Sequence, residues 1–467
     1  MKPPAATEPS PAQVNKTGIP TWSVGTLTYT KAGLAVLFFW LLWGDFAWQM
    51  KERGILYTVE VLLKKFDASD LVNGVLVGAV PPIVLVVLGP ILSYRSDRHR
   101  GILGRRIPYL LAITPVAVLG IVGLAFSPAL GAWLHSLLGA RSPGLNPLVI
   151  GWFVVFWTIF ELASNGGFSI FNALVNDVVP RPLLGRFFGL FRTATLLAAI
   201  VFNYFFLGYA ETEYFWIFLG IALVYGAGFT SMCLKVKEGD YPAVPPGGGH
   251  PLASLKQYCR ECFGNSYYLW FFATFGLPYV AFAPVNLFNI FFAKSIAMNL
   301  GSFGKYLALT YVISICLAYG LGSLADRFHP LRVSLFSIAL YACVTLWGGL
   351  FARTPETFAI ALVGHGVASG MWMTSVAGLP QVLLPKSRFA QFHSAIYITM
   401  NLGIMIYNPF MGLILDHFGH NYRLTYLAAS VLSLLAFISG IILYRKFLNL
   451  GGMANYRAPG EVPEYSN

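Results

Sequence analysis

Twelve apolar segments constrain this chain of 467 residues more than any other feature of its sequence. Each is long enough to cross a lipid bilayer as an α-helix, which takes about 20 residues. A segment in lipid must satisfy its own backbone hydrogen bonds, so an apolar segment of this length is expected to be helical. We therefore predict an all-α membrane protein with twelve transmembrane helices. The segments span residues 30–62, 71–94, 107–127, 148–178, 187–209, 213–235, 266–293, 305–323, 331–352, 357–384, 390–415 and 424–446.

The composition excludes several other classes of protein. Hydrophobic residues make up 57% of the chain and charged residues only 11%, whereas soluble domains carry about 25% charged residues. The segments between the spans are too short to form a soluble catalytic domain, and no phosphate-binding loop or metal-ligand motif is present. We therefore expect neither an enzyme, a nucleic-acid-binding protein nor a disordered chain, and we expect no cofactor and no bound metal.

Lysine and arginine are distributed unequally between the two ends of the spans. Of the 31 basic residues, 22 lie on the side that carries both termini, seven on the other side, and two, Lys51 and Arg53, within the first span. Cytoplasmic loops carry an excess of lysine and arginine, so both termini are predicted to be cytoplasmic. This bias also accounts for the net charge of +12 without a nucleic-acid partner. We expect a multi-pass protein of the inner or plasma membrane.

The chain divides into two similar halves. Residues 237–264 are polar and rich in proline and glycine, which is typical of a flexible linker. Asp97-Arg98 follows the second span and Asp326-Arg327 follows the eighth, as in the parallel repeats of two-domain transporters. The predicted parts are a disordered cytoplasmic tail (1–27), a six-helix bundle (28–236), a cytoplasmic linker (237–264), a second six-helix bundle (265–447) and a cytoplasmic tail (448–467).

The segment between the second and third spans carries the most specific motif. It reads Ser96-Asp97-Arg98, five further residues, and Gly104-Arg105-Arg106-Ile107-Pro108-Tyr109. An acid and several arginines between two helix ends can form ion pairs that hold one face of the two halves together and re-form as a transporter changes state. Alternatively, these charges only satisfy the positive-inside rule. The predicted gating residues are Asp97, Arg98, Arg105, Arg106, Asp177, Arg186, Asp326 and Arg327.

This motif resembles one found in the sucrose/proton symporters, in the glycoside–pentoside–hexuronide cation symporter branch of the major facilitator superfamily. A second similarity lies in the fourth span, which reads Glu161-x-Ala163-x-Asn165 and ends in Asp177, 16 residues after the first acid. The resemblance implies two six-helix bundles, alternating access, a sugar or glycoside substrate, and Glu161 as the proton-binding carboxylate. The plant carriers have an arginine where this chain has Asn172, so neither sucrose nor their coupling mechanism is carried over.

The residues themselves also favour a functional role for Glu161. An ionised carboxylate at bilayer depth is costly, so it is expected to face a wet cavity and to exchange a proton. Asn165, Asn172 and Asn176 lie on the same stripe of the predicted helix as Glu161. The alternative is that Glu161 only holds neighbouring helices together.

The first span contains more charges than any other. Asp45, Gln49, Glu52 and Arg53 fall on one predicted face, with Lys51 roughly opposite. We predict Asp45 and Glu52 as further coupling residues, and Gln49 and Arg53 as substrate ligands. Lys51 or Arg53 could instead pair with Glu161, or Lys51 to Arg53 could lie at an aqueous mouth.

Aromatic and amide side chains supply the remaining candidate ligands. Trp48 and Trp372 are predicted to stack on sugar rings, although most aromatic residues here are expected in the core or at the lipid surface. His365 is either a ligand or a hydrogen-bonded structural residue. The predicted substrate-binding set is Trp48, Gln49, Arg53, Asn165, Asn172, Asn286, Asn289, His365, Trp372 and Asn401.

These observations together predict a secondary transporter. The expected activity is proton-coupled symport of a sugar or glycoside by a monomer in the lipid bilayer, with sodium as the alternative coupling ion. Two alternatives stay open: an exporter of amphipathic small molecules, and a non-transporting membrane assembly or pigment-handling factor. The charges inside the spans argue against the last of these, because a scaffold does not require them.

Overall fold

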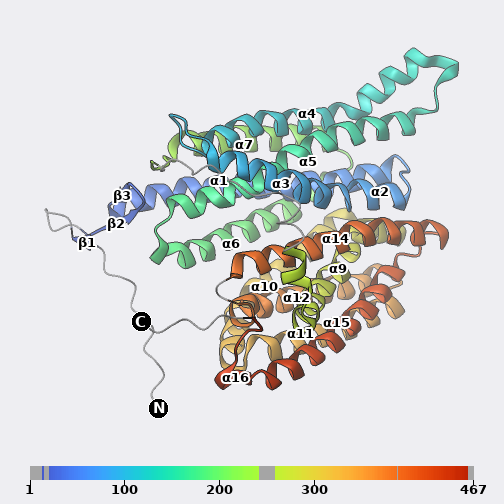
Figure 1. Cartoon of the computed structure of the whole chain (residues 1–467). Helices are drawn as coiled ribbons and strands as arrows, with labels where there is room; N and C mark the ends of the chain where they lie inside the picture. Colours follow the sequence, from blue (N-terminus) through green and yellow to red (C-terminus); the bar gives the residue numbers. More distant parts are fainter. Residues whose placement is uncertain (1–12, 15–19, 241–257, 386–387, 461–467) are drawn as a thin grey trace. The chain divides into compact units, whose positions relative to one another are not determined.

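The computed structural model describes residues 13–14, 20–240, 258–385 and 388–460, and these are almost entirely helical (Figure 1). Within them, twelve helical segments are long and apolar enough to cross a membrane, which confirms the predicted all-α fold with twelve spans. The long helices are α1 (Lys31–Lys65), α3 (Val80–Arg98), α4 (Ile107–Leu138), α5 (Leu145–Val178), α6 (Leu184–Val201), α7 (Tyr214–Lys235), α9 (Ser266–Ser295), α10 (Leu300–Phe328), α11 (Pro330–Phe351), α12 (Pro355–Val376), α14 (Phe389–His417) and α15 (Arg423–Asn449). The shorter helices are α2 (Asp70–Leu76), α13 (Leu379–Leu383) and α16 (Gly452–Asn455).

Two of the spans are interrupted helices. The second consists of α2 and α3, which are separated by a turn just before Pro81 and Pro82. The fifth continues from α6 through a π-helical turn, Phe202–Phe206, and a 3-10 turn, Leu207–Tyr209. Interrupted helices occur in membranes where neighbouring helices or a cavity satisfy the freed backbone groups.

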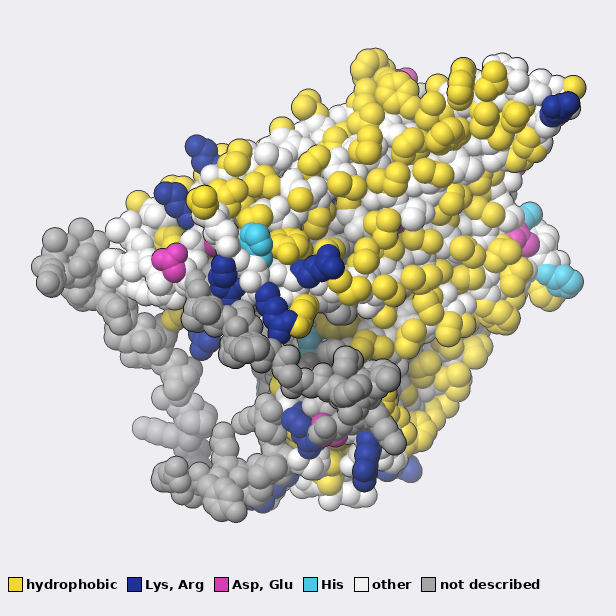
Figure 2. Space-filling model, turned by 45° about the horizontal axis from the view of Figure 1, so that its top comes forward, with side chains coloured by type: hydrophobic (Ala, Val, Ile, Leu, Met, Phe, Trp, Pro, Cys, Tyr) yellow, Lys and Arg dark blue, Asp and Glu magenta, His cyan; other side chains and the backbone are white. Residues whose placement is uncertain are grey.

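The surface of the helices suits contact with lipid. Large hydrophobic side chains such as Phe39, Trp216, Leu223 and Ile406 are exposed. Figure 2 shows hydrophobic side chains over most of the helical surface in that view. Exposed apolar area on this scale is typical of a membrane-embedded protein rather than a water-soluble one.

The contacts divide the chain into two compact units. Unit 1 comprises Met1–Thr58, Val84–Phe202 and Thr212–Pro245, and unit 2 comprises Val59–Ile83, Asn203–Glu211 and Pro246–Asn467. These boundaries differ from the predicted bundles, 28–236 and 265–447, because segments from the first, second and fifth spans cluster with the later helices.

In unit 1, α4 packs closely against α5 because glycines face the contact. A Cβ atom on Gly120 would lie 2.8 Å from the backbone nitrogen of Phe160, and one on Gly131 would lie 3.0 Å from the Cα atom of Val149. Small residues allow such approach between membrane helices. The packing places the charged residues of α5 in a fixed position against the bundle.

In unit 2, α2 packs against α14 in the same way. A Cβ atom on Gly74 would lie 2.7 Å from the carbonyl oxygen of Asn408, and one on Gly412 would lie 2.8 Å from the Cα atom of Leu71. The two backbones therefore touch along the length of α2. This contact positions Asp70, at the start of α2, beside the segment that follows α14.

The N-terminal segment contains a small antiparallel sheet in the order β1–β2–β3. Its strands are β1 (Gln13–Val14), β2 (Pro20–Val24) and β3 (Leu27–Tyr29), and Gly25 adopts a positive φ of 55° at the hairpin turn. The backbone N–H of Asp240 donates to the Thr26 hydroxyl over 2.8 Å. This hydrogen bond connects the hairpin, which lies mostly within the predicted tail 1–27, to the segment after α7.

Candidate functional site

A buried charge network connects α1 to α5 in unit 1. Lys51 is 0% exposed, and its Nζ atom lies 2.6 Å from Glu52 Oε1 and 3.7 Å from the centre of the Trp48 ring. Lys51 also donates to the Ser164 hydroxyl, which itself donates to Glu52 over 2.5 Å. The helical projection places Lys51 roughly opposite Glu52, but the two side chains are in contact. The long lysine side chain bends back, so that its ammonium group reaches the Glu52 carboxylate.

Glu161 lies at the edge of this network. It is 5% exposed on α5 and accepts a hydrogen bond from the Asn165 amide one turn later. It is also within electrostatic reach of Lys51 and Glu52. In the structure Glu161 lies near Glu52 and Asn165, two other predicted site residues, and also near Lys51 and Ser164. With two carboxylates and one lysine, the group can take up one proton without accumulating net charge.

Asp45 forms a second buried carboxylate on α1. It accepts hydrogen bonds of 3.3 Å from Gln49 and from Thr195 of α6, so it links these two helices. The other amides of the predicted stripe bond within their own helix: Asn172 donates to the Phe168 carbonyl and Asn176 to the Asn172 carbonyl, each over 2.9 Å. Arg53 is half-buried and near enough to Glu52 to interact with it electrostatically.

The two tryptophans predicted to stack on sugar are each 1% exposed. Trp48 packs against Phe171 and Phe229, and the Lys51 ammonium lies over its ring. Trp372 packs edge-on against Phe282 and other aromatic rings. The structure therefore favours packing roles for both, because a buried ring has no free face for a sugar.

A second polar group lies in unit 2 between α9, α11 and α12. His365 is buried, and its ring nitrogens lie 2.9 Å from the Tyr341 hydroxyl and 3.0 Å from the Asn286 amide oxygen. Asn289, one turn after Asn286, accepts a hydrogen bond of 3.1 Å from the Tyr426 hydroxyl. Three predicted residues, Asn286, Asn289 and His365, therefore lie close together. The sequence did not reveal their partners Tyr341 and Tyr426.

The remaining predicted ligand of unit 2, Asn401, forms a hydrogen bond within its own helix. Asn401 on α14 donates to the Tyr397 carbonyl over 2.8 Å, within its own helix. This bond satisfies one N–H of the amide. No described contact connects Asn401 to the His365 group.

The predicted charge cluster between α3 and α4 is assembled in unit 1. Arg105 forms a bidentate ion pair with Asp177, with distances of 3.0 and 2.6 Å, and Arg106 reaches the same carboxylate over 3.1 Å. Arg106 also pairs with Asp97 and donates to the Ser96 hydroxyl over 3.0 Å. These contacts lie inside unit 1, and a gating role of the cluster between the two halves stays a prediction.

Glu238 completes this cluster and was missed from the sequence. Its carboxylate accepts hydrogen bonds from the backbone N–H groups of Arg105, Arg106 and Ile107, over 3.0, 2.8 and 2.8 Å. A carboxylate at a helix N-terminus is stabilised by the unpaired N–H groups and the helix dipole. Glu238 thereby caps α4, although 131 residues separate it from Ile107.

The remaining predicted gating residues give less information. Arg98 stacks on the Tyr94 ring at 3.8 Å, and Arg327 is exposed with its guanidinium 5.3 Å from the Phe328 ring. The side chains of Arg186 and Asp326 lie outside the described part of the structure. The equivalent cluster in the second half therefore stays a prediction.

A third charged group, which the sequence did not reveal, joins α2 to the α14–α15 connection in unit 2. The buried Asp70 carboxylate lies 2.6 Å from His420 Nδ1 and accepts a hydrogen bond of 2.9 Å from Tyr422. Lys64 donates to the Tyr422 hydroxyl over 3.0 Å. Burial raises the pKa of the Tyr422 hydroxyl and the Asp70 carboxylate raises it further, so Tyr422 remains a donor.

Asp416 strengthens the same group. Its carboxylate accepts the backbone N–H groups of Asp70 and Leu71 over 2.8 and 2.9 Å. Ligand atoms of Asp70, Asp416 and His420 lie within 4.8 Å of one another, as a metal site would require. However, the carboxylate oxygens of Asp70 and Asp416 already accept hydrogen bonds. We therefore interpret the cluster as a structural one that fixes the start of α2 against the α14–α15 connection.

Comparison with known proteins identifies the relatives of this chain. The Major Facilitator Superfamily profile matches residues 32–332 and 287–452, and no curated protein matches the chain. A D-xylose–proton symporter has 13% identity and a TM-score of 0.64, covering 88% of this chain and 97% of its own. A bacterial homologue of the human lysosomal transporter Spinster has 14% identity and a TM-score of 0.63, covering 92% and 100%. The nucleoside transporter NupG has 13% identity and a TM-score of 0.61, covering 88% and 99%.

Proposed function

This chain belongs to the major facilitator superfamily, and on that basis we propose that it is a secondary transporter that couples the movement of a sugar or glycoside to protons. It is a multi-pass membrane protein with twelve spans. The fold alone does not choose the substrate, because proteins named as transporters of xylose and of nucleosides share it. The choice therefore depends on the residues inside the spans.

The observation that carries the proposal is the network of Lys51, Glu52, Ser164 and Glu161. Glu52 is paired with Lys51, whereas the direct hydrogen bond to Glu161 in the described structure comes from the neutral Asn165 amide. A buried carboxylate without its own ion pair is expected to bind a proton readily. In the proposed cycle, Glu161 is protonated when the substrate is bound and releases the proton on the other side of the membrane.

The sugar assignment rests on the motif similarity and on the chemistry of the polar groups. The Arg105-Arg106 motif and the Glu161–Asn165 spacing resemble those of the glycoside–cation symporters. Amides and hydroxyls, such as those of Asn286 and Tyr341 around His365, are suitable partners for sugar hydroxyls.

The direct test is transport by the purified protein in liposomes. We expect uptake of at least one labelled mono- or disaccharide to accelerate when an inward proton gradient is imposed, and to be unaffected by an inward sodium gradient. Export of cationic amphipathic dyes in place of sugar uptake would instead support the exporter. Sugar uptake that is indifferent to pH but driven by sodium would overturn proton coupling.

One substitution distinguishes a loss of proton coupling from a loss of folded protein. Glu161→Gln should abolish proton-driven accumulation while leaving sugar counterflow between equal pools, because the amide cannot release a proton. The matched control is Glu213→Gln, which changes an exposed carboxylate just before α7. If accumulation persists in Glu161→Gln, the proposed proton site is wrong.

A further inference from the structure

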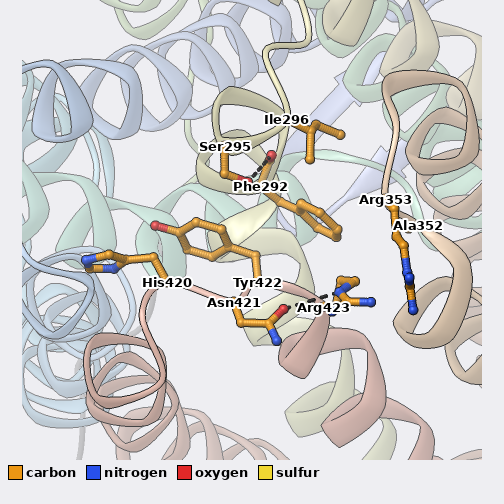
Figure 3. Close-up of a pocket in the computed structure, with 9 residues that line it drawn as sticks. All are labelled: Phe292, Ser295, Ile296, Ala352, Arg353, His420, Asn421, Tyr422 and Arg423. Carbon is orange, nitrogen blue, oxygen red and sulfur yellow. Dashed lines mark hydrogen bonds between the residues drawn. The ribbon is translucent and has the colours of Figure 1, made fainter.

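A pocket of 330 Å³ lies in unit 2 where α9 ends and where α12 and α15 begin. Its lining comes from Phe292, Ser295, Ile296, Ala352, Arg353, His420, Asn421, Tyr422 and Arg423 (Figure 3). This volume is at the small end of the range for ligand sites. Phe292, Ile296, Ala352 and the Tyr422 ring make one part of the wall apolar, while the rest is polar or charged.

The charges that line the pocket are all of one sign. Arg353 and Arg423 lie on the same side of the Tyr422 ring in Figure 3, and His420 lies on the other side, where it contacts Asp70. The lining contains no carboxylate, and among the described residues neither arginine forms an ion pair. Two guanidinium groups beside one small cavity repel each other, and an anion between them would relieve this repulsion.

Around Arg423, the local hydrogen bonds leave donors available. Arg423 Nε donates to the Asn421 side-chain oxygen over 3.3 Å, which leaves the Asn421 N–H₂ group and the outer nitrogens of Arg423 as donors. In addition, α15, a helix of 27 residues, begins at the lining residue Arg423, so the positive end of its dipole adjoins the pocket.

From this arrangement we propose that the pocket binds an anionic group of the phosphate or carboxylate type between Arg353 and Arg423. Arginine binds such groups through two parallel N–H···O bonds, which gives both strength and orientation. The apolar wall formed by Phe292 and Ile296 would cover the body of the molecule that carries the anion. This site is separate from the proposed proton site and does not depend on the transported substrate.

Two sources can supply this chemistry. One is a soluble phosphate or carboxylate on the side of the membrane that the charge bias predicts to be non-cytoplasmic. The other is the headgroup of an anionic phospholipid, since the pocket lies at helix ends and Phe351 and Phe418 nearby in the sequence are exposed. Both sources require the same two arginines, so one set of variants tests both.

The experiment uses the full-length protein in two settings. In an uncharged detergent, the thermal unfolding midpoint is followed during titration with inorganic phosphate, with sodium chloride at equal ionic strength as the reference. In nanodiscs of phosphatidylcholine with or without phosphatidylglycerol, native mass spectrometry counts the retained lipids. The variants are Arg353→Gln, Arg423→Gln and Asn421→Asp, and the matched control is Arg141→Gln, an exposed arginine in the α4–α5 connection.

We expect a saturable rise of the midpoint with phosphate, or selective retention of phosphatidylglycerol, in the wild type and in the Arg141 control. Each arginine variant should weaken binding about tenfold, since a charge-assisted bond contributes on that scale. Asn421→Asp keeps both arginines but places a carboxylate in the pocket, so it should abolish binding without removing a cation. Absence of a saturable effect in both settings, or equal effects in all variants, would overturn the proposal.

Discussion

Two pairs of arginines illustrate opposite uses of the same side chain. Arg105 and Arg106, before α4, share the Asp177 carboxylate, and Arg106 also pairs with Asp97. Arg353 and Arg423 line a pocket without a carboxylate. Carboxylates balance the charge of the first pair, whereas among the described residues the second pair has no ion pair.

The difference indicates which pair is structural and which is available to a ligand. A charge cluster with matched carboxylates holds helix ends together and loses stability when one partner is removed. Arginines that face a cavity contribute little to folding, but they can bind an external anion. Four substitutions test this contrast, and their effects should decrease in the order Asp177, Glu238, Tyr422 and Arg353.

Removal of the shared carboxylate should have the largest effect. Asp177→Asn leaves Arg105 and Arg106 without their common partner in a mostly buried position, so the free energy of unfolding should fall by about 2–3 kcal/mol. Chemical denaturation in detergent measures this change, with Glu213→Gln as the exposed control. An effect no larger than that of the control would show that the cluster is not structural.

Loss of the α4 cap should cost less. Glu238→Ala leaves three backbone N–H groups, those of Arg105, Arg106 and Ile107, without their acceptor, and we expect a loss of about 1–2 kcal/mol. Glu238→Gln retains one oxygen acceptor and should fall between the wild type and the alanine variant. Hydrogen exchange at the start of α4 checks the location of the effect, and unchanged protection there would contradict the capping role.

At the edge of the pocket, Tyr422→Phe removes the hydroxyl that donates to Asp70 and accepts from Lys64. The ring remains to fill its space and His420 still contacts Asp70, so the loss of these two hydrogen bonds should cost about 1 kcal/mol in total. Thermal unfolding measures it. If the loss matches that of Asp177→Asn, the hydrogen bonds of Tyr422 contribute as much to stability as the shared carboxylate of Arg105 and Arg106, and the expected order of effects is wrong.

The smallest effect is expected for Arg353→Gln. In buffer without phosphate or anionic lipid, its unfolding free energy should lie within about 0.5 kcal/mol of the wild type, and relief of repulsion could make it slightly more stable. The same denaturation experiment compares it directly with Asp177→Asn. A loss above about 2 kcal/mol would indicate an internal partner for Arg353 and would remove the basis of the contrast.

The sequence predicts what depends on local pattern. The twelve spans follow from segment length and hydropathy, and the Asp97–Arg106 cluster follows from a motif of a few residues. Asp177 was predicted because the fourth span resembles that of the glycoside–cation symporters, with an acid 16 residues after Glu161. These features need no knowledge of which helices pack together.

The missed contacts connect residues that are far apart in the chain. Asp70 meets His420 across 350 positions, and Glu238 caps α4 from beyond the sixth span. No periodicity reports such pairs, because they depend on which helix ends meet after folding. Lys51 was misplaced for another reason: a helical projection gives the direction of Cβ, not the reach of a long flexible side chain.

Unit 2 is built from segments that are far apart in the chain, which limits how the protein can be cut into fragments that fold. Its helix α2 comes from the first third of the chain, yet Gly74 and Gly412 bring it into backbone contact with α14. A polypeptide beginning at residue 258 would carry α14 with a groove where α2 belongs, and would lack Asp70 for His420. Complementation of separately expressed fragments would therefore require both pieces to insert together, and a C-terminal fragment alone is a poor starting point for isolated study.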